Sequence, residues 1–95
     1  MLKRNFNFYA DAGHGWLEVT PTDLERVGMK VSEFSNFSYK DEMQKSCIYY
    51  LEEDKDCWQF LNRWHQSVGD ENTYTVTQYD MGQKCWIRDL AHINW

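Results

Sequence analysis

The residues of this chain that are best suited to chemistry stand in the stretch DAGHGW, which runs from Asp11 to Trp16. His14 lies between two glycines, and Asp11 precedes it by three residues. Imidazole titrates near neutral pH, and a carboxylate that accepts a hydrogen bond from the ring fixes its tautomer. Such a pair can serve acid–base catalysis or bind a small ligand. The same pattern is typical of a tight turn, in which Asp11 accepts backbone hydrogen bonds while Gly13 and Gly15 adopt positive φ.

A second candidate site is the acidic segment YLEEDKD, residues 50–56, which is followed closely by a tryptophan. Carboxylates at the start of a helix cap free N–H groups and interact favourably with the helix dipole, which explains them without a function. Paired carboxylates also occur in glycosidases and at Mg²⁺ sites, and an acidic cluster suits a basic partner. Together with Asp11, His14 and Trp16, the candidate binding residues are Glu52, Glu53, Asp54, Asp56 and Trp58.

Catalytic and metal-binding motifs of familiar types are missing from the sequence. Closed zinc sites use cysteine and histidine pairs spaced two to four residues apart. No such pair occurs among the cysteines and histidines of this chain, which are Cys47, Cys57, Cys85, His14, His65 and His92. No serine nucleophile elbow, zinc-protease helix, phosphate loop or dinucleotide fingerprint occurs either. We therefore expect no enzyme activity, no catalytic residue, no metal site and no cofactor.

Charge and aromatic content indicate a protein-binding surface. The chain has 95 residues and a net charge of −5, all of which lies in residues 41–95, with ten acidic and five basic side chains. Nucleic-acid binding normally needs clustered Lys and Arg, so direct binding to nucleic acid is not expected. Five Trp, six Tyr and five Phe are more than so small a core can bury, so some should lie at the surface. An acidic, aromatic face suits a basic protein partner, although net charge also serves solubility.

Local patterns predict a hairpin followed by a short helix. Residues 5–9 and 16–19 alternate between apolar and polar side chains, which indicates two strands around the DAGHG connection. Thr20 is a suitable N-cap, with Pro21 at the first helical position and a carboxylate three residues after the cap. Gly28 is a typical residue for the end of this helix.

The rest of the chain predicts four more strands and a long helix. Aromatic and β-branched residues favour strands over 31–41 and 47–53, with the polar DEMQKS segment as a turn. A helix capped by Asp54 should run to about Val68, with a buried stripe of apolar residues, and Gly69 should end it. Strands over 73–79 and 84–90 should flank a turn at Gly82. The last five residues, AHINW, are ambiguous.

These elements predict one α+β domain with the order β-β-α-β-β-α-β-β. The short connections favour an antiparallel sheet of five to six strands, packed in two layers against one long and one short helix. The uncovered face should display Trp16, several tyrosines and the threonines of TYTVT. Three widely spaced cysteines predict free thiols, and no apolar run approaches a membrane helix or leader peptide. We therefore expect a soluble cytoplasmic protein.

Several stretches together resemble a family of small uncharacterised proteins of phages, prophages and plasmids. They are DAGHGWLEV, SNFSY, YLEEDKD and WIRDL, in the family's order and across nearly the whole chain. The chain departs from the pattern at Ala12, where the family usually has proline, and its C-terminal third matches less well. The family has no established activity. The resemblance implies the setting of a mobile element, whose accessory proteins often bind and disable a host protein.

The leading hypothesis is a non-enzymatic protein that binds a host factor, such as a CRISPR-type or other defence nuclease or the transcription machinery. One alternative is a small-ligand binder or enzyme that uses Asp11 and His14. Another is a mimic of DNA, in which rows of carboxylates imitate phosphates. The sequence leaves the oligomeric state open, and a dimer is among the options.

Overall fold

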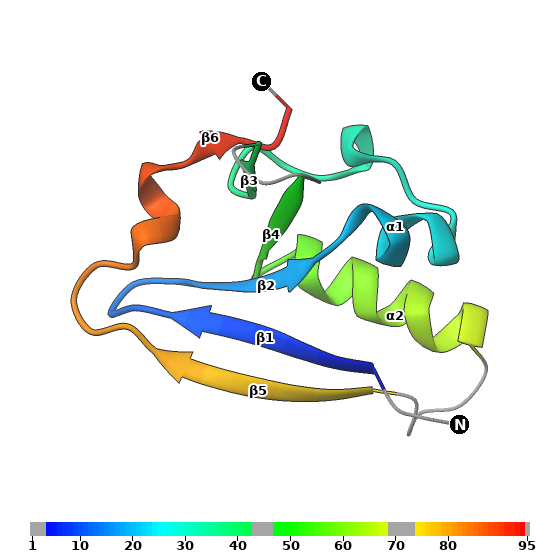
Figure 1. The fold of residues 1–95 in the computed structure, drawn as a ribbon, viewed down its shortest axis with the longest axis horizontal. Coiled ribbons are helices and arrows are strands. Elements are labelled where there is room, and N and C mark those ends of the chain that lie inside the picture. Colours follow the sequence, from blue (N-terminus) through cyan, green and yellow to red (C-terminus); the bar gives the residue numbers. More distant parts are fainter. Residues whose placement is uncertain (1–3, 43–46, 69–73, 95) are drawn as a thin grey trace.

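Two helices pack on one face of a six-stranded mixed sheet in the computed structural model, which describes residues 4–42, 47–68 and 74–94 (Figure 1). The strand order across the sheet is β5-β1-β2-β4-β3-β6. The elements are β1 (Arg4–Ala10), β2 (Gly15–Val19), α1 (Pro21–Val27), the 3₁₀ turn η1 (Val31–Glu33), β3 (Tyr39–Asp41), β4 (Ile48–Glu52), α2 (Asp56–Val68), β5 (Tyr74–Asp80), the 3₁₀ turn η2 (Trp86–Asp89) and β6 (Ala91–His92). The predicted α+β class, with one short and one long helix, is confirmed.

The predicted hairpin is formed by β1 and β2, which pair antiparallel with Phe8 opposite Leu17. The alternation of side chains divides the hairpin between two clusters. Phe6, Leu17 and Val19 lie in the main core under the helices, while Trp16 belongs to a smaller cluster on the opposite face of the sheet.

Helix α1 has the termini that its sequence predicts. The backbone N–H of Asp23 donates to Oγ1 of Thr20 at 3.1 Å, and the N–H of Thr20 donates to Oδ2 of Asp23 at 2.9 Å. This reciprocal pair satisfies two N–H groups that the helix itself cannot. Gly28 ends the helix with φ of 69°, in the left-handed region that favours glycine.

The long helix is confirmed, but it begins at Asp56, two residues after the predicted cap. Asp54 lies in the preceding turn, where its backbone N–H donates to Glu52 Oε2 at 3.0 Å. The predicted stripe is buried: Cys57, Phe60, Leu61 and Trp64 face the main core. The predicted end of this helix at Gly69 lies outside the described residues.

The strand predicted over residues 31–41 is wrong for most of its length, because only Tyr39–Asp41 pairs in the sheet. The preceding loop is held away from the sheet by Asp56, whose Oδ2 accepts the backbone N–H of Ser35 at 2.8 Å. The next predicted strand is confirmed as β4. The DEMQKS turn between them falls largely on residues 43–46, which lie outside the described residues.

Strand β5 pairs parallel with β1, whereas the other strand pairs are antiparallel as predicted. Parallel neighbours need a crossover connection, and α2 supplies one. Strand β4 is antiparallel to β2, which is antiparallel to β1, so β4 runs in the same direction as β1. Strand β5 is parallel to β1, and β4 and β5 therefore run in the same direction with β1 and β2 between them. The helix therefore joins two parallel strands across the main-core face (Figure 1).

The strand predicted over residues 84–90 is wrong, because this segment forms η2 and leaves the sheet. Gly82 has the predicted positive φ, 77°, but the chain does not return as a hairpin. Instead, η2 covers the second face of the sheet, where Cys85 and Ile87 pack with Trp16 and Tyr50.

Trp16 is therefore only 2% exposed, which contradicts its predicted display on an open face. The threonines of β5 are exposed, and Thr75 and Thr77 both donate to Asn5 Oδ1. The cysteines are free thiols, as predicted. Among the described residues, no helix combines the length and apolar character needed to cross a lipid bilayer.

Candidate functional site

A pocket of about 220 Å³ lies on the second face of the sheet, between the DAGHG loop, the end of β4 and η2. Aromatic rings and three polar groups line it: His14, Trp16, Phe37, Tyr39, Glu52 and Arg88. The imidazole, the carboxylate and the guanidinium give this pocket both hydrogen-bonding and charged groups. It includes three of the eight candidate binding residues.

Asp11 holds the DAGHG loop in place, but its side chain does not line the pocket. Its Oδ1 accepts the backbone N–H groups of Gly13 and His14, each at 3.0 Å, as the turn interpretation predicts. Its Oδ2 accepts the N–H of Cys85 at 2.9 Å, which joins the loop to η2.

Arg88 binds the same carboxylate with two nitrogens. Its Nε donates to Oδ2 at 2.5 Å and its Nη2 donates to Oδ1 at 2.9 Å. The Asp11 side chain is fully buried, and the Arg88 guanidinium holds the pKa of that carboxyl well below its usual range. The guanidinium also lies 5.2 Å from the centre of the Trp16 ring. Asp11 thus positions Arg88 at the pocket.

The glycines of this loop serve close packing and not unusual backbone angles. The prediction that Gly13 and Gly15 adopt positive φ is wrong, because among the described residues only Gly28 and Gly82 do so. A Cβ on Gly15 would lie 2.4 Å from the Phe8 ring and 3.2 Å from Glu53 Oε2. Only glycine therefore lets β2 start against these two side chains.

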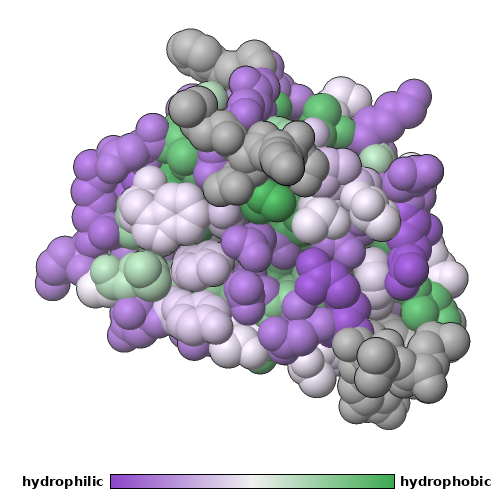
Figure 2. All heavy atoms as spheres, in the orientation of Figure 1, coloured by the Kyte–Doolittle hydropathy of each residue, from purple (hydrophilic) through white to green (hydrophobic). Residues whose placement is uncertain are grey.

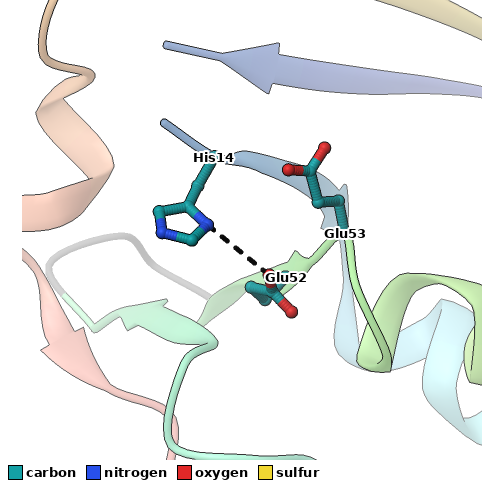
Figure 3. Close-up of side chains that lie close together, drawn as sticks. All are labelled: His14, Glu52 and Glu53. Atoms are coloured by element: carbon teal, nitrogen blue, oxygen red, sulfur yellow. Dashed lines mark ion pairs between the residues drawn. The ribbon is translucent and has the colours of Figure 1, made fainter. Parts of the chain in front are cut away.

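His14 faces Glu52, not Asp11. Its Nδ1 lies 3.7 Å from Glu52 Oε1, and its half-exposed ring is turned toward that carboxylate (Figure 3). The predicted base–orienter pair of Asp11 and His14 is not formed in the described structure, since both oxygens of Asp11 are engaged by Arg88 and backbone N–H groups.

Glu52 is the buried carboxylate of the pocket, with a side chain only 6% exposed. Its Oε2 accepts the N–H of Asp54, and burial raises the pKa of the Glu52 carboxyl. Glu52 lies opposite Trp16 in the pairing of β2 with β4, which brings the acidic segment beside the DAGHG loop. The two sequence candidates are therefore one site.

Glu53 completes a cluster with His14 and Glu52. Its backbone N–H donates to the carbonyl of Gly15 at 3.0 Å, so it continues the alignment of β4 with β2 by one residue. One ligand atom from each of the three side chains lies within 4.8 Å of the others. Figure 3 shows the two glutamates leaving adjacent positions at the end of β4, with the imidazole beside them. All three residues were candidates, but the sequence does not show that they lie together, because the pairing of β2 with β4 brings His14 beside the two glutamates.

The other acidic candidates lie outside the pocket lining. Asp54 is exposed, whereas Asp56 is fully buried, which excludes solvation as its role. Asp56 Oδ2 accepts Ser35 Oγ at 2.8 Å and Ser38 Oγ at 2.5 Å, and Oδ1 has no partner. Ser38 Oγ in turn accepts the N–H of Glu52 at 2.9 Å. Asp56 therefore supports the Phe37–Tyr39 side of the pocket and the backbone of Glu52.

Beside the pocket, two exposed aromatic rings and one partly buried ring gather where β1, β5 and η2 meet. The Tyr9 ring stacks on Tyr79 at 5.3 Å between centroids and meets Trp86 edge-on at 5.8 Å. Tyr79 is 44% exposed and Trp86 is 40% exposed. We call Tyr9, Tyr79 and Trp86 the aromatic patch. Figure 2 shows pale, weakly polar surface on the side of the molecule where η2 and the loop after β5 lie.

The charge next to the aromatic patch is negative. Glu18 accepts the hydroxyl of Tyr50 at 3.3 Å and forms no ion pair with any described residue. The basic side chains of the neighbouring η2 region are both engaged, Arg88 with Asp11 and Lys84 with Asp89. Trp58, the remaining candidate, is 59% exposed on α2 and does not line the pocket.

Comparison with known proteins places this chain in no family: no family model, no curated protein and no solved structure matches it.

Proposed function

We propose that this chain is a non-enzymatic binding protein that docks on a basic surface of a partner protein through the aromatic patch. The resemblance in its motifs suggests the setting, an accessory protein of a phage or related element that disables a host protein in the host cytoplasm. A defence nuclease is a suitable target class, because proteins that bind nucleic acids carry the Lys and Arg clusters that phosphates require.

The observation that carries this proposal is the exposure of Tyr79 and Trp86 on a small chain of net charge −5. Tryptophan and tyrosine are the side chains most enriched among residues that dominate binding energy. Their ring faces also attract the guanidinium and ammonium groups of a partner. The Glu18 carboxylate beside the patch accepts hydrogen bonds from Asn7 and Tyr50 but forms no ion pair with a described residue, and its charge adds to this attraction. A basic partner would therefore gain both apolar contact and charge complementarity here.

The test begins with capture of partners from host lysate at physiological salt and continues with titration of the purified partner. We expect Trp86→Gln and Tyr79→Thr each to weaken binding at least tenfold, because hot-spot truncations of this kind cost more than about 1.4 kcal/mol. Rising ionic strength should slow association, since electrostatic steering is screened by salt.

The matched control is Trp58→Gln, which removes a tryptophan that is at least as exposed but lies on α2. This variant should bind as the wild type does. Equal loss from the Trp58 and Trp86 variants, or a partner whose contact surface is not basic, would contradict the proposal.

A further inference from the structure

The distance between His14 and Glu52 suits a shared cation better than a direct bond. Nδ1 and Oε1 are 3.7 Å apart, beyond the range of about 2.7–3.2 Å for an N–H···O hydrogen bond. Two ligand atoms that each lie about 2.1 Å from one metal ion are separated by roughly 3.4 Å at the tetrahedral angle, which a side-chain shift of about 0.3 Å would reach. The Glu53 carboxylate, within 4.8 Å of both atoms, can supply a third ligand.

The burial of Glu52 is an independent observation that points to a cation. The side chain is only 6% exposed, and Oε2 already accepts the backbone N–H of Asp54. Within the described residues, Oε1 accepts no hydrogen bond and is directed at the pocket and His14 (Figure 3). One hydrogen bond to Oε2 offsets only part of the cost of burying most of this carboxylate, and a cation bound to Oε1 from the pocket side would offset more of it.

The backbone around the three side chains is fixed before any ion arrives. Asp11 holds the His14 end of the loop, and the N–H of Glu53 donates to Gly15 on the neighbouring strand. Ser38, itself bound to Asp56, accepts the N–H of Glu52. Ligands held in this way lose little freedom on binding, which favours affinity.

We infer that His14, Glu52 and Glu53 form a binding site for one divalent transition-metal ion of the zinc class, open toward the pocket. An imidazole with two carboxylates suits Zn²⁺, Mn²⁺, Co²⁺ or Ni²⁺, whereas Ca²⁺ and Mg²⁺ prefer ligand sets made only of oxygen. Three protein ligands leave coordination positions free, as in zinc sites that bind a further molecule. The site shares no residue with the aromatic patch, so it does not depend on the proposed docking.

The experiment is calorimetric titration of the chelator-treated protein with ZnCl₂ and with MnCl₂. We expect one ion per chain and weaker binding in acid, because protons compete with the metal for its ligand atoms. His14→Ala and Glu52→Gln should each lower the affinity at least tenfold. His65→Ala and Glu25→Gln, which change exposed residues elsewhere, should leave it unchanged.

A second measurement locates the ion without relying on the variants. Mn²⁺ should broaden the ring-proton NMR resonances of His14 before those of His65, and thermal unfolding of each variant checks that it folds. The inference is overturned if His14→Ala binds zinc as tightly as the wild type, if Cys47→Ser abolishes binding that His14→Ala retains, or if the wild type binds neither ion.

Discussion

Asp11 and Arg88 are 77 positions apart in the chain, yet they form a paired ion bridge in which Nε and Nη2 donate to Oδ2 and Oδ1 at 2.5 Å and 2.9 Å. The carboxylate is fully buried and also accepts three backbone N–H groups, from Gly13, His14 and Cys85. The Asp11 side chain therefore connects the first loop of the fold to η2 and positions Arg88 in the wall of the pocket.

Loss of the guanidinium should destabilise the fold more than loss of a surface charge. Arg88→Gln leaves the buried carboxylate of Asp11 without its cation, and we expect a loss of about 2–4 kcal/mol in the free energy of unfolding. Lys84→Gln breaks the exposed pair with Asp89 and should cost less than about 1 kcal/mol. Urea unfolding followed by tryptophan fluorescence measures both. Similar losses for the two variants would contradict a structural role for the buried pair.

The same pair predicts a dependence of stability on acid. The pKa of Asp11 is lower in the folded protein than its ordinary value of 3.8. Its contribution is therefore complete above that value and is lost as the pH falls through the folded pKa. Asp11→Asn should be much less stable than the wild type at pH 7, and the difference should shrink steadily below about pH 4. Unfolding titrations from pH 7 to pH 2 test this; a constant difference would refute it.

The effect of Glu52 on stability should depend on pH in the opposite direction to that of Asp11. Burial raises the pKa of its carboxyl, so the folded protein binds this proton more tightly than the unfolded chain does. Ionised Glu52 thus lowers stability at neutral pH, and protonation relieves the cost as the pH falls through the raised pKa. In metal-free buffer, Glu52→Gln should be more stable than the wild type at pH 7 and lose this advantage near pH 4. An advantage that grows in acid would contradict the assignment, and exposed Glu25→Gln is the control.

Gly15 should tolerate no side chain, because a Cβ there would lie 2.4 Å from the Phe8 ring. Gly15→Ala must push apart β1 and β2 or displace the ring, and overpacking of this kind costs about 1–3 kcal/mol. At Gly13 the nearest atom is the end of the flexible Arg88 side chain, at 3.0 Å, so Gly13→Ala should cost less. Thermal unfolding compares the two variants. The reverse order would show that the close approach at Gly15 is readily relieved.

Asp56 should contribute far more to stability than the nearby Asp54. Asp56→Ala removes the acceptor of two part-buried hydrogen bonds from Ser35 and one buried hydrogen bond from Ser38, and a buried donor left unpaired costs about 1–3 kcal/mol. Asp54→Ala changes an exposed side chain and should stay within about 0.5 kcal/mol of the wild type. Chemical denaturation distinguishes the two positions, and comparable effects would argue against the buried role.

Signals between neighbouring residues predicted much of this fold. Thr20 and Gly28 set the ends of α1, and the alternation in β1 and β2 assigned their side chains to the correct faces. The failures have a common cause. Residues 31–38 and 84–90 are rich in strand-forming side chains. The first segment instead donates a backbone hydrogen bond from Ser35 to Asp56, and the second donates one from Cys85 to Asp11. Such contacts join residues far apart in sequence, where no local pattern records them.

The candidate site was predictable in its members but not in their partners. His14 and the glutamates stand out by residue type, yet the pairing of Trp16 with Glu52 across two strands decides that the histidine faces Glu52. Arg88 lies in the WIRDL stretch but was not among the candidates, because a single arginine in an apparent strand is unremarkable until its carboxylate partner is known.

The parallel pairing of β1 with β5 has a consequence for the order of folding. β1 can complete its ladder only after residues 74–80 have been synthesised, and the DAGHG loop gains its last partners only when residue 88 is present. Contacts of such long sequence separation slow folding, because the loop entropy is lost before the contacts form. A nascent chain therefore carries the DAGHG loop without its final partners until residue 88 has been synthesised. The wall of the pocket that Arg88 forms is thus assembled after the segments that carry His14 and Glu52.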